Sequence, residues 1–163
     1  MLNSLLLQIA TFFSIGRFPK APGTLATLAT VPIWYGLALT GPFIYMLVTL
    51  LLVPVGIWAA QAYEDQSGKH DSKEIVIDEV VGFLITMVWV PITWQSAIAG
   101  FVLFRFFDIV KPPPIRQMDQ KIPGGFGVMA DDIAAGLISS VIMQLLYTQT
   151  NWLGSQILIL TPS

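Results

Sequence analysis

Residues 21–63 read APGTLATLATVPIWYGLALTGPFIYMLVTLLLVPVGIWAAQAY and contain no charged side chain. A helix needs about 20 apolar residues to span the hydrocarbon core of a bilayer, and this run is roughly twice that long. The turn sequence Thr40-Gly41-Pro42 divides the run, because glycine and proline favour turns over helix. The stretch therefore predicts two membrane helices, from about Thr24 to Leu39 and from about Phe43 to Tyr63.

The composition of the whole chain agrees with this interpretation. Of its 163 residues, 55% are hydrophobic and 11% are charged, and the mean hydropathy is +0.72. These values lie well outside the usual balance of a soluble domain. The length suits one domain, and no linker or internal repeat interrupts residues 1–163. We expect a single domain embedded in the lipid bilayer.

Charge and residue usage exclude several classes of function. The formal net charge is −2 and no basic run occurs, so nucleic acid is not an expected partner. The absence of cysteine excludes disulfides, thiolate zinc sites and cysteine nucleophiles, and the single His70 excludes mechanisms that need two histidines. The first thirteen residues lack a basic region and a cleavage site, so we expect them to remain in or on the membrane.

The middle of the chain consists of a polar segment followed by a second apolar segment. A polar stretch, Glu64 to Glu79, predicts a water-facing loop, and the uncharged stretch Val80 to Phe104 follows it. The sequence Trp89-Val-Pro-Ile-Thr-Trp94 lies within that second stretch, and its proline and tryptophans are typical of a turn at a membrane interface. We expect two short helices, about Ile75 to Val90 and Thr93 to Val110.

The last part of the chain is predicted less completely. Lys111 to Ala130 is rich in proline and glycine and predicts a loop, and Asp132 to Tyr147 predicts a final helix. Residues 149–163 fit either an interfacial segment or a continuation of that helix. The predicted fold is an all-α, polytopic integral membrane helical bundle with about five membrane helices, some of them short.

The distribution of charge along these helices predicts an orientation. If the chain crosses the membrane as predicted, all eight Lys and Arg residues and all ten Asp and Glu residues lie on one side. Lys and Arg are enriched in cytoplasmic loops, so this side is expected to be cytoplasmic. The prediction is a multi-pass protein with one charged cytoplasmic face.

Acidic residues from three separate segments lie at this face, and they are the first candidate site. Carboxylates near a bilayer are costly, and their oxygens are the ligands that Mg²⁺ prefers. The alternative is that each acid marks a membrane boundary or caps a helix. We favour a metal site because three segments contribute acids at one depth; the candidate residues are Asp78, Glu79, Asp108, Asp131 and Asp132.

Basic residues accompany these acids and are candidates for binding phosphate. Arg105, Asp108 and Lys111 follow one another at helical spacing, and an arginine fork suits a phosphate oxygen pair. Arg17 and Lys20, together with a helix start at Thr24, form a second group that could reach the same phosphate. The alternative for both groups is an ion-pair ladder or contact with anionic lipid.

Glycine and other small residues suggest how the acids meet. Asp132, Ala135, Gly136 and Ser139 form one small-residue face, and Asp78 with Gly82 begins another, so the two helices can approach closely. The glycines of residues 124–127 are expected to let a loop backbone approach a ligand.

An ion or proton transporter is the alternative function. Such a protein uses buried acids to relay cations across the bilayer, which requires carboxylates near the midplane or on both sides. The predicted confinement of all charges to one side leaves no such path, so a phosphate-handling enzyme is favoured.

Four motifs resemble those of the phosphatidylglycerophosphatase A family of bacterial inner-membrane enzymes. They are Gly16 to Thr24, Ile77-Asp-Glu-Val-Val-Gly82, Leu103-Phe-Arg-Phe-Phe-Asp-Ile-Val-Lys-Pro112, and Gly124-Gly-Phe-Gly-Val-Met-Ala-Asp-Asp-Ile-Ala-Ala-Gly136. The resemblance implies Mg²⁺-dependent removal of the terminal phosphate from phosphatidylglycerophosphate, which yields phosphatidylglycerol. It also implies that the five acids listed above are functional, with Arg105 and Lys111 beside them. The sequence leaves open which of Asp131 and Asp132 binds metal, and whether water or a carboxylate attacks the phosphorus.

Overall fold

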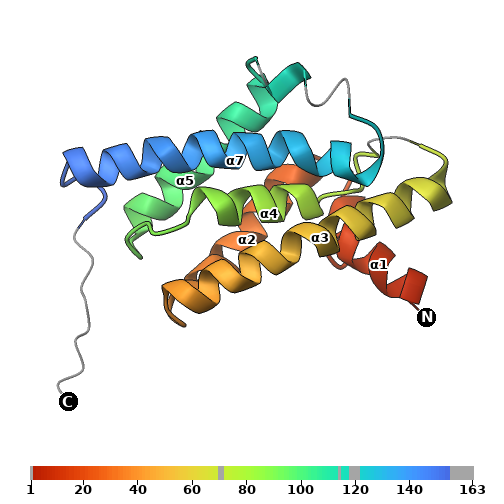
Figure 1. Ribbon diagram of the computed structural model, residues 1–163, viewed down its shortest axis with the longest axis horizontal. Coiled ribbons are helices and arrows are strands. Elements are labelled where there is room, and N and C mark those ends of the chain that lie inside the picture. The colour runs from red at the N-terminus through yellow and green to blue at the C-terminus, as the bar shows by residue number, and fades with distance from the viewer. Residues whose placement is uncertain (1, 70–71, 114, 118–121, 155–163) are drawn as a thin grey trace.

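The computed structural model describes residues 2–69, 72–113, 115–117 and 122–154, and no strand occurs among them (Figure 1). The predicted all-helical class is therefore confirmed. In chain order the helices are α1 (Leu2–Ala10), the 3₁₀ helix η1 (Ile15–Arg17), α2 (Pro22–Ala38), α3 (Pro42–Ser67), α4 (Ile77–Thr86), α5 (Trp94–Val110) and α7 (Gly124–Gln149).

Local sequence signals set most helix ends. Pro22 and Pro42 occupy the first positions of α2 and α3, where the missing amide hydrogen costs nothing. Gly68 ends α3 in the left-handed conformation, with φ of 66°. Thr93 caps α5 by accepting a hydrogen bond of 3.1 Å from the Ser96 amide. The predicted turns at residues 40–42 and 89–94 are both present.

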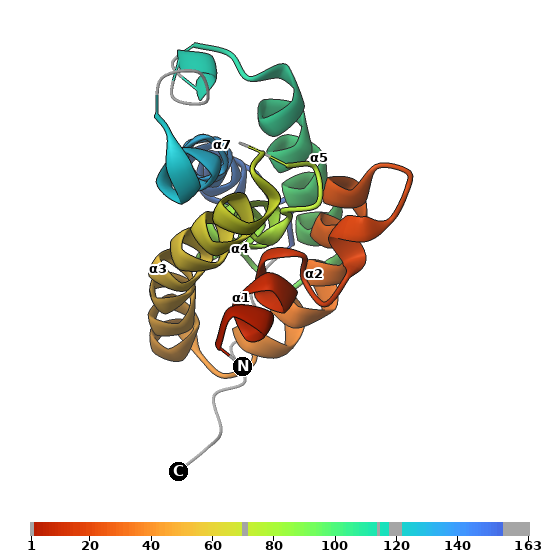
Figure 2. The ribbon, with the colours of Figure 1, turned by 90° about the vertical axis from the view of Figure 1, so that its right-hand side faces the viewer.

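The short helix α4 forms the centre of the bundle. It contacts α2, α3, α5 and α7, and the view along the molecule shows it enclosed by these helices (Figure 2). Eight of its ten residues are buried, including Asp78. A helix that is apolar on all sides belongs in a core, so α4 is a buried core helix with an acidic N-terminal turn.

Two glycines bring α4 and α7 into backbone contact. A Cβ atom on Gly136 would lie 2.5 Å from the Gly82 carbonyl oxygen, and one on Gly82 would lie 2.8 Å from the Asp132 carbonyl oxygen. Phe104 of α5 closes the same contact from the side. The predicted close approach of the two small-residue faces is confirmed.

Three predicted helix boundaries were wrong. Helix α3 continues to Ser67, four residues into the stretch predicted as a loop. Helix α4 ends at Thr86, not near Val90. Helix α7 begins at Gly124, so residues 124–130 of the predicted loop are helical and Asp132 lies inside the helix. The reason is tertiary packing: the Gly125 amide donates a 2.8 Å hydrogen bond to Gln61 Oε1, and a Cβ on Gly125 would collide with the α3 backbone. These contacts offset the low helix propensity of glycine.

The exterior of the bundle is strongly apolar. Helices α3 and α7 have 26 residues each, and both are long and apolar enough to cross a membrane. Large hydrophobic side chains are exposed on α2, α3, α5 and α7, among them Phe43, Leu50, Trp58, Val102 and Val141. Exposed apolar surface of this extent is typical of membrane proteins. The number of five membrane helices and the single charged face stay predictions.

The end of the described chain folds back onto the turn before α5. Helix α7 ends at Gln149, and the buried Leu153 accepts a 2.7 Å hydrogen bond from Thr93 Oγ1 through its carbonyl. Of the two alternatives that the sequence left open for the tail, a continuation of the last helix does not occur in residues 150–154. Residues 155–163 lie outside the described residues.

Candidate active site

A cavity of about 380 Å³ lies at the N-terminal end of α4. The start of α2, the loop before α4, the end of α5 and the third turn of α7 all contribute to its wall. Its lining includes Ala21, Pro22, Gly23, Thr24, Ser72, Lys73, Ile75, Asp78, Glu79, Arg105, Asp108, Ile109, Lys111, Asp131 and Asp132. All five predicted acids therefore meet in one place.

Three of these acids form a compact cluster. Asp78, Glu79 and Asp132 each offer a carboxylate oxygen, and these oxygens lie within 4.8 Å of one another. One oxygen of each, Asp78 Oδ1, Glu79 Oε2 and Asp132 Oδ2, is buried and has no hydrogen-bond partner among the described residues. Buried carboxylates this close repel one another unless a cation lies between them. The donor set fits a hard divalent cation such as Mg²⁺.

The glycine contact between α4 and α7 brings these acids together. Asp78 and Asp132 each lie one helical turn before the glycine of their own helix that forms the contact, Gly82 and Gly136 respectively. Residues one turn apart share a helix face. Close backbone approach at the glycines therefore places the two carboxylates opposite each other, and Glu79 follows Asp78 in the first turn of α4.

Arg105 connects α5 with the acid cluster. Its guanidinium Nη1 hydrogen-bonds to Asp108 Oδ2 on the same helix and lies 3.7 Å from Glu79 Oε1. The arginine side chain is only 15% exposed, and its Nε has no hydrogen-bond partner among the residues that the structure covers. A largely buried guanidinium with donors to spare suits an incoming anion.

Lys111 departs from the predicted helical stripe. It lies just beyond α5 with φ of 43°, in the left-handed conformation, and its Nζ lies 2.6 Å from Asp131 Oδ2 on α7. The stripe of Arg105, Asp108 and Lys111 on one helix face was therefore wrong in its last member. The helix ends before it because Pro112 and Pro113 follow.

The neighbouring aspartates of α7 have different surroundings. Asp131 contacts Lys111, whereas Asp132 belongs to the cluster with Asp78 and Glu79. Neither caps a helix, since both lie in the interior of α7.

The predicted N-terminal phosphate group is only partly at the cavity. Thr24 lines it, but Arg17 and Lys20 do not. Helix α2 starts at Pro22, so only residues 21–24 reach the cavity. Arg17 lies in η1, where its Nε is 3.6 Å from Glu74 Oε2.

Sequence reasoning missed two contributors to the wall. A Cβ on Gly23 would collide with the Glu79 carboxylate and lie 3.2 Å from Arg105 Nη1, so this glycine leaves space for both groups. Lys73 lies in the polar loop before α4. A glycine directly after the helix-starting Pro22 was the available signal for the first; no sequence signal separates Lys73 from the other lysines of its loop.

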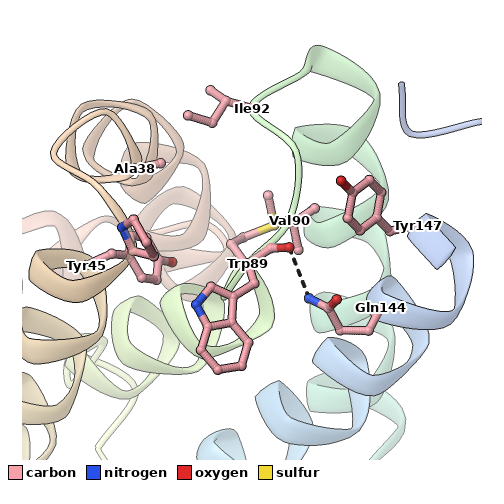
Figure 3. A pocket seen from close by; sticks show the side chains of 9 residues that line it. Ala38, Tyr45, Trp89, Val90, Ile92, Gln144 and Tyr147 are labelled. Atoms are coloured by element: carbon pink, nitrogen blue, oxygen red, sulfur yellow. Dashed lines mark hydrogen bonds between the residues drawn. The ribbon is translucent and has the colours of Figure 1, made fainter. Parts of the chain in front are cut away.

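A second cavity, of about 430 Å³, lies at the opposite end of α4 (Figure 3). Gln144 Nε2 donates a 3.2 Å hydrogen bond to the Trp89 carbonyl there (Figure 3). The remaining wall is mainly apolar and contains no charged side chain; it includes Ala38, Pro42, Tyr45, Met87, Trp89, Val90, Ile92 and Tyr147. The ionic chemistry therefore belongs to the cavity at the N-terminal end of α4.

Comparisons with known proteins identify the family of the chain. The family model described as phosphatidylglycerophosphatase A matches residues 8–147. The phosphatidylglycerophosphatase A of Escherichia coli (strain K12) is 40% identical over 136 residues, which cover 83% of this chain and 79% of the relative. The protein of the same name from Haemophilus influenzae is 39% identical over 137 residues, covering 83% and 84%.

A third relative carries a different name. The protein from Bacteroides thetaiotaomicron, provisionally named a phosphatidylinositol-3-phosphatase, is 41% identical over 143 residues, which cover 83% of this chain and 89% of the relative. No solved structure matches the chain. The family match includes all five acids and all three cations of the cavity, so the chain belongs to the phosphatidylglycerophosphatase A family.

Proposed function

We propose that this protein is a phosphatidylglycerophosphatase, a phosphoric monoester hydrolase that removes the terminal phosphate of phosphatidylglycerophosphate and leaves phosphatidylglycerol. The observation that carries the proposal is the cavity in which three clustered carboxylates adjoin a buried arginine. Two relatives near 40% identity bear the name of this activity.

The acid cluster is proposed to hold Mg²⁺. Asp78, Glu79 and Asp132 would supply its protein ligands, each through an oxygen that otherwise lacks a partner among the described residues. When bound there, the ion supplies charge neutralisation for the phosphate and a lowered pKa for a bound water.

The cations of the cavity have separate tasks in this proposal. Arg105 binds the terminal phosphate through donors that its pairs with Asp108 and Glu79 leave free, and it stabilises charge on the transferring phosphoryl group. Lys111 holds Asp131 and so fixes the wall between α5 and α7. Phosphate monoesters hydrolyse very slowly unaided, and a barrier reduction of about 20 kcal/mol requires such a concentration of fixed charge.

The proposed lipid substrate and the apolar exterior support a membrane setting. We propose a multi-pass protein of a bacterial inner membrane whose cavity opens on the cytoplasmic side. The two long apolar helices and the exposed hydrophobic side chains support a bilayer location, and the predicted loops that carry Lys and Arg support the orientation.

The test is phosphate release by the purified protein from phosphatidylglycerophosphate in uncharged detergent micelles. We expect release with Mg²⁺ and none after chelation. Phosphatidylinositol 3-phosphate belongs in the same assay, because the relative from Bacteroides thetaiotaomicron bears the name of that activity. Absence of phosphate release from both lipids would refute the proposal. Faster release from phosphatidylinositol 3-phosphate would identify that lipid, in place of phosphatidylglycerophosphate, as the substrate.

A further inference from the structure

Lys73 is the cation of the cavity that no carboxylate of the described residues engages. Arg105 pairs with Asp108 and Glu79, and Lys111 pairs with Asp131. Lys73 lines the same cavity and its side chain is exposed. The acids of the cavity outnumber its cations, so an uncommitted lysine there is available to an anionic ligand.

Hydrogen bonds and an ion pair hold the backbone at Lys73 and in the residues that follow it. The Ile75 amide donates a 2.8 Å hydrogen bond to the Ser72 carbonyl, which closes a turn around Lys73. The next residues are anchored too, because Val76 donates a 2.9 Å hydrogen bond to the Ala10 carbonyl and Glu74 pairs with Arg17. This turn therefore holds the lysine at the rim of the cavity.

The proposed substrate brings two phosphates to this cavity. Its terminal monoester is the group that is cleaved, and its phosphodiester joins the head group to the diacylglycerol. The acid cluster with its ion and Arg105 account for the first group. The second remains in the product and needs a cation that carries no other ion pair, and a lysine serves as such a point charge.

We propose that Lys73 binds the phosphodiester of the lipid and thereby makes the site selective for head groups with a second phosphate. This inference rests on the proposed phosphatase function. It assigns Lys73 a role in binding and none in bond cleavage, so its loss should affect KM and leave kcat nearly unchanged.

The test compares Lys73→Ala with the unaltered protein in uncharged micelles that contain phosphatidylglycerophosphate and Mg²⁺. We expect KM to rise about tenfold, which corresponds to the loss of one charge-assisted contact at a partly solvated site. Two inhibitors then separate the two phosphate sites. The inhibition constant of phosphatidylglycerol, which has only the phosphodiester, should rise by a similar factor, and that of inorganic phosphate should stay the same.

Two further variants control for charge and folding. Lys73→Arg should restore most of the affinity, and Lys69→Ala, which removes an exposed lysine of the same loop that does not line the cavity, should leave both inhibition constants unchanged. An unchanged KM in Lys73→Ala, or equal weakening of phosphatidylglycerol and inorganic phosphate, would overturn the inference. If the unaltered protein releases phosphate neither from phosphatidylglycerophosphate nor from phosphatidylinositol 3-phosphate, the proposed function itself is refuted.

Discussion

Asp131 and Asp132 are adjacent in sequence, yet the structure gives them different partners. Neighbours on an α-helix point about 100° apart. Asp132 lies with Asp78 and Glu79, and Asp131 lies against Lys111. The sequence predicted that the two neighbours separate but not which of them joins the cluster, because the register of α7 depends on where the helix begins and what it packs against.

The first prediction tests this difference with amides of equal size. Asp132→Asn should raise the Mg²⁺ concentration for half-maximal phosphate release by at least about tenfold and lower the maximal rate, because it removes a proposed ligand. Asp131→Asn should lower the rate but keep the half-saturating Mg²⁺ concentration within about threefold. Magnesium titrations of phosphate release by both variants make the measurement, and the reverse ranking would contradict the assignment.

Gly23 is the second residue whose role only the structure reveals. Gly23→Ala should reduce phosphate release by about 100-fold, because the added methyl group displaces Glu79 and Arg105 from their positions. The thermal unfolding midpoint should change little, since the clash is with side chains at a cavity. Gly36→Ala is the matched control on the same helix: apart from the adjoining backbone of its own helix, no neighbour lies within 4 Å of the new Cβ, and activity should persist. Full activity of Gly23→Ala would show that Glu79 and Arg105 tolerate displacement.

At the level of elements, local sequence signals determine some helix ends and tertiary contacts determine others. The turns at Gly41-Pro42 and before Thr93 were predictable, because proline, glycine and a capping threonine act on their own neighbours. The start of α7 was not predictable. The glycine-rich residues 124–127 are helical because they pack against the α3 backbone and hydrogen-bond to Gln61. Convergence of the acids was predictable from their common depth, but the pairing of Lys111 with Asp131 was not.

The helix crossing itself gives a third prediction. Gly136→Ala should lower the free energy of unfolding by about 1–3 kcal/mol, because its Cβ would lie 2.5 Å from the Gly82 carbonyl oxygen and the backbones must separate. Thermal unfolding in detergent measures the change. Leu137→Ala is the control at the next position, where the residue is 55% exposed. This variant should lower the free energy of unfolding far less. Equal destabilisation by both variants would show that the crossing is not specially tight.

For the whole molecule, composition was the strongest guide. Hydropathy predicted a helical bundle with an apolar exterior, and the exposed side chains on α2, α3, α5 and α7 agree with it. Composition could not predict that α4 is a ten-residue core helix. A buried helix and a membrane helix are equally apolar, and only the contacts with neighbours distinguish them.

The fourth prediction concerns orientation. The chain contains no cysteine, so single cysteines at Lys69 and Thr40 can be labelled without other changes. In intact bacterial cells a membrane-impermeant maleimide that reaches the periplasm should label Thr40→Cys, and it should label Lys69→Cys only after lysis, because the two residues lie at opposite ends of α3. Labelling of both, or of neither, in intact cells would contradict the proposed single crossing by α3.

The glycine crossing also has a thermodynamic consequence. Asp78 and Asp132 each stand one turn from the contact between Gly82 and Gly136, so an ion that fixes the distance between the acids also fixes the distance between the helices. Under the proposed Mg²⁺ binding, the metal affinity and the stability of the folded state are linked, and each must change the other by the same free energy. Magnesium then contributes to folding as well as to catalysis: a cell short of the ion holds this enzyme in a less tightly packed form, more open to proteolysis.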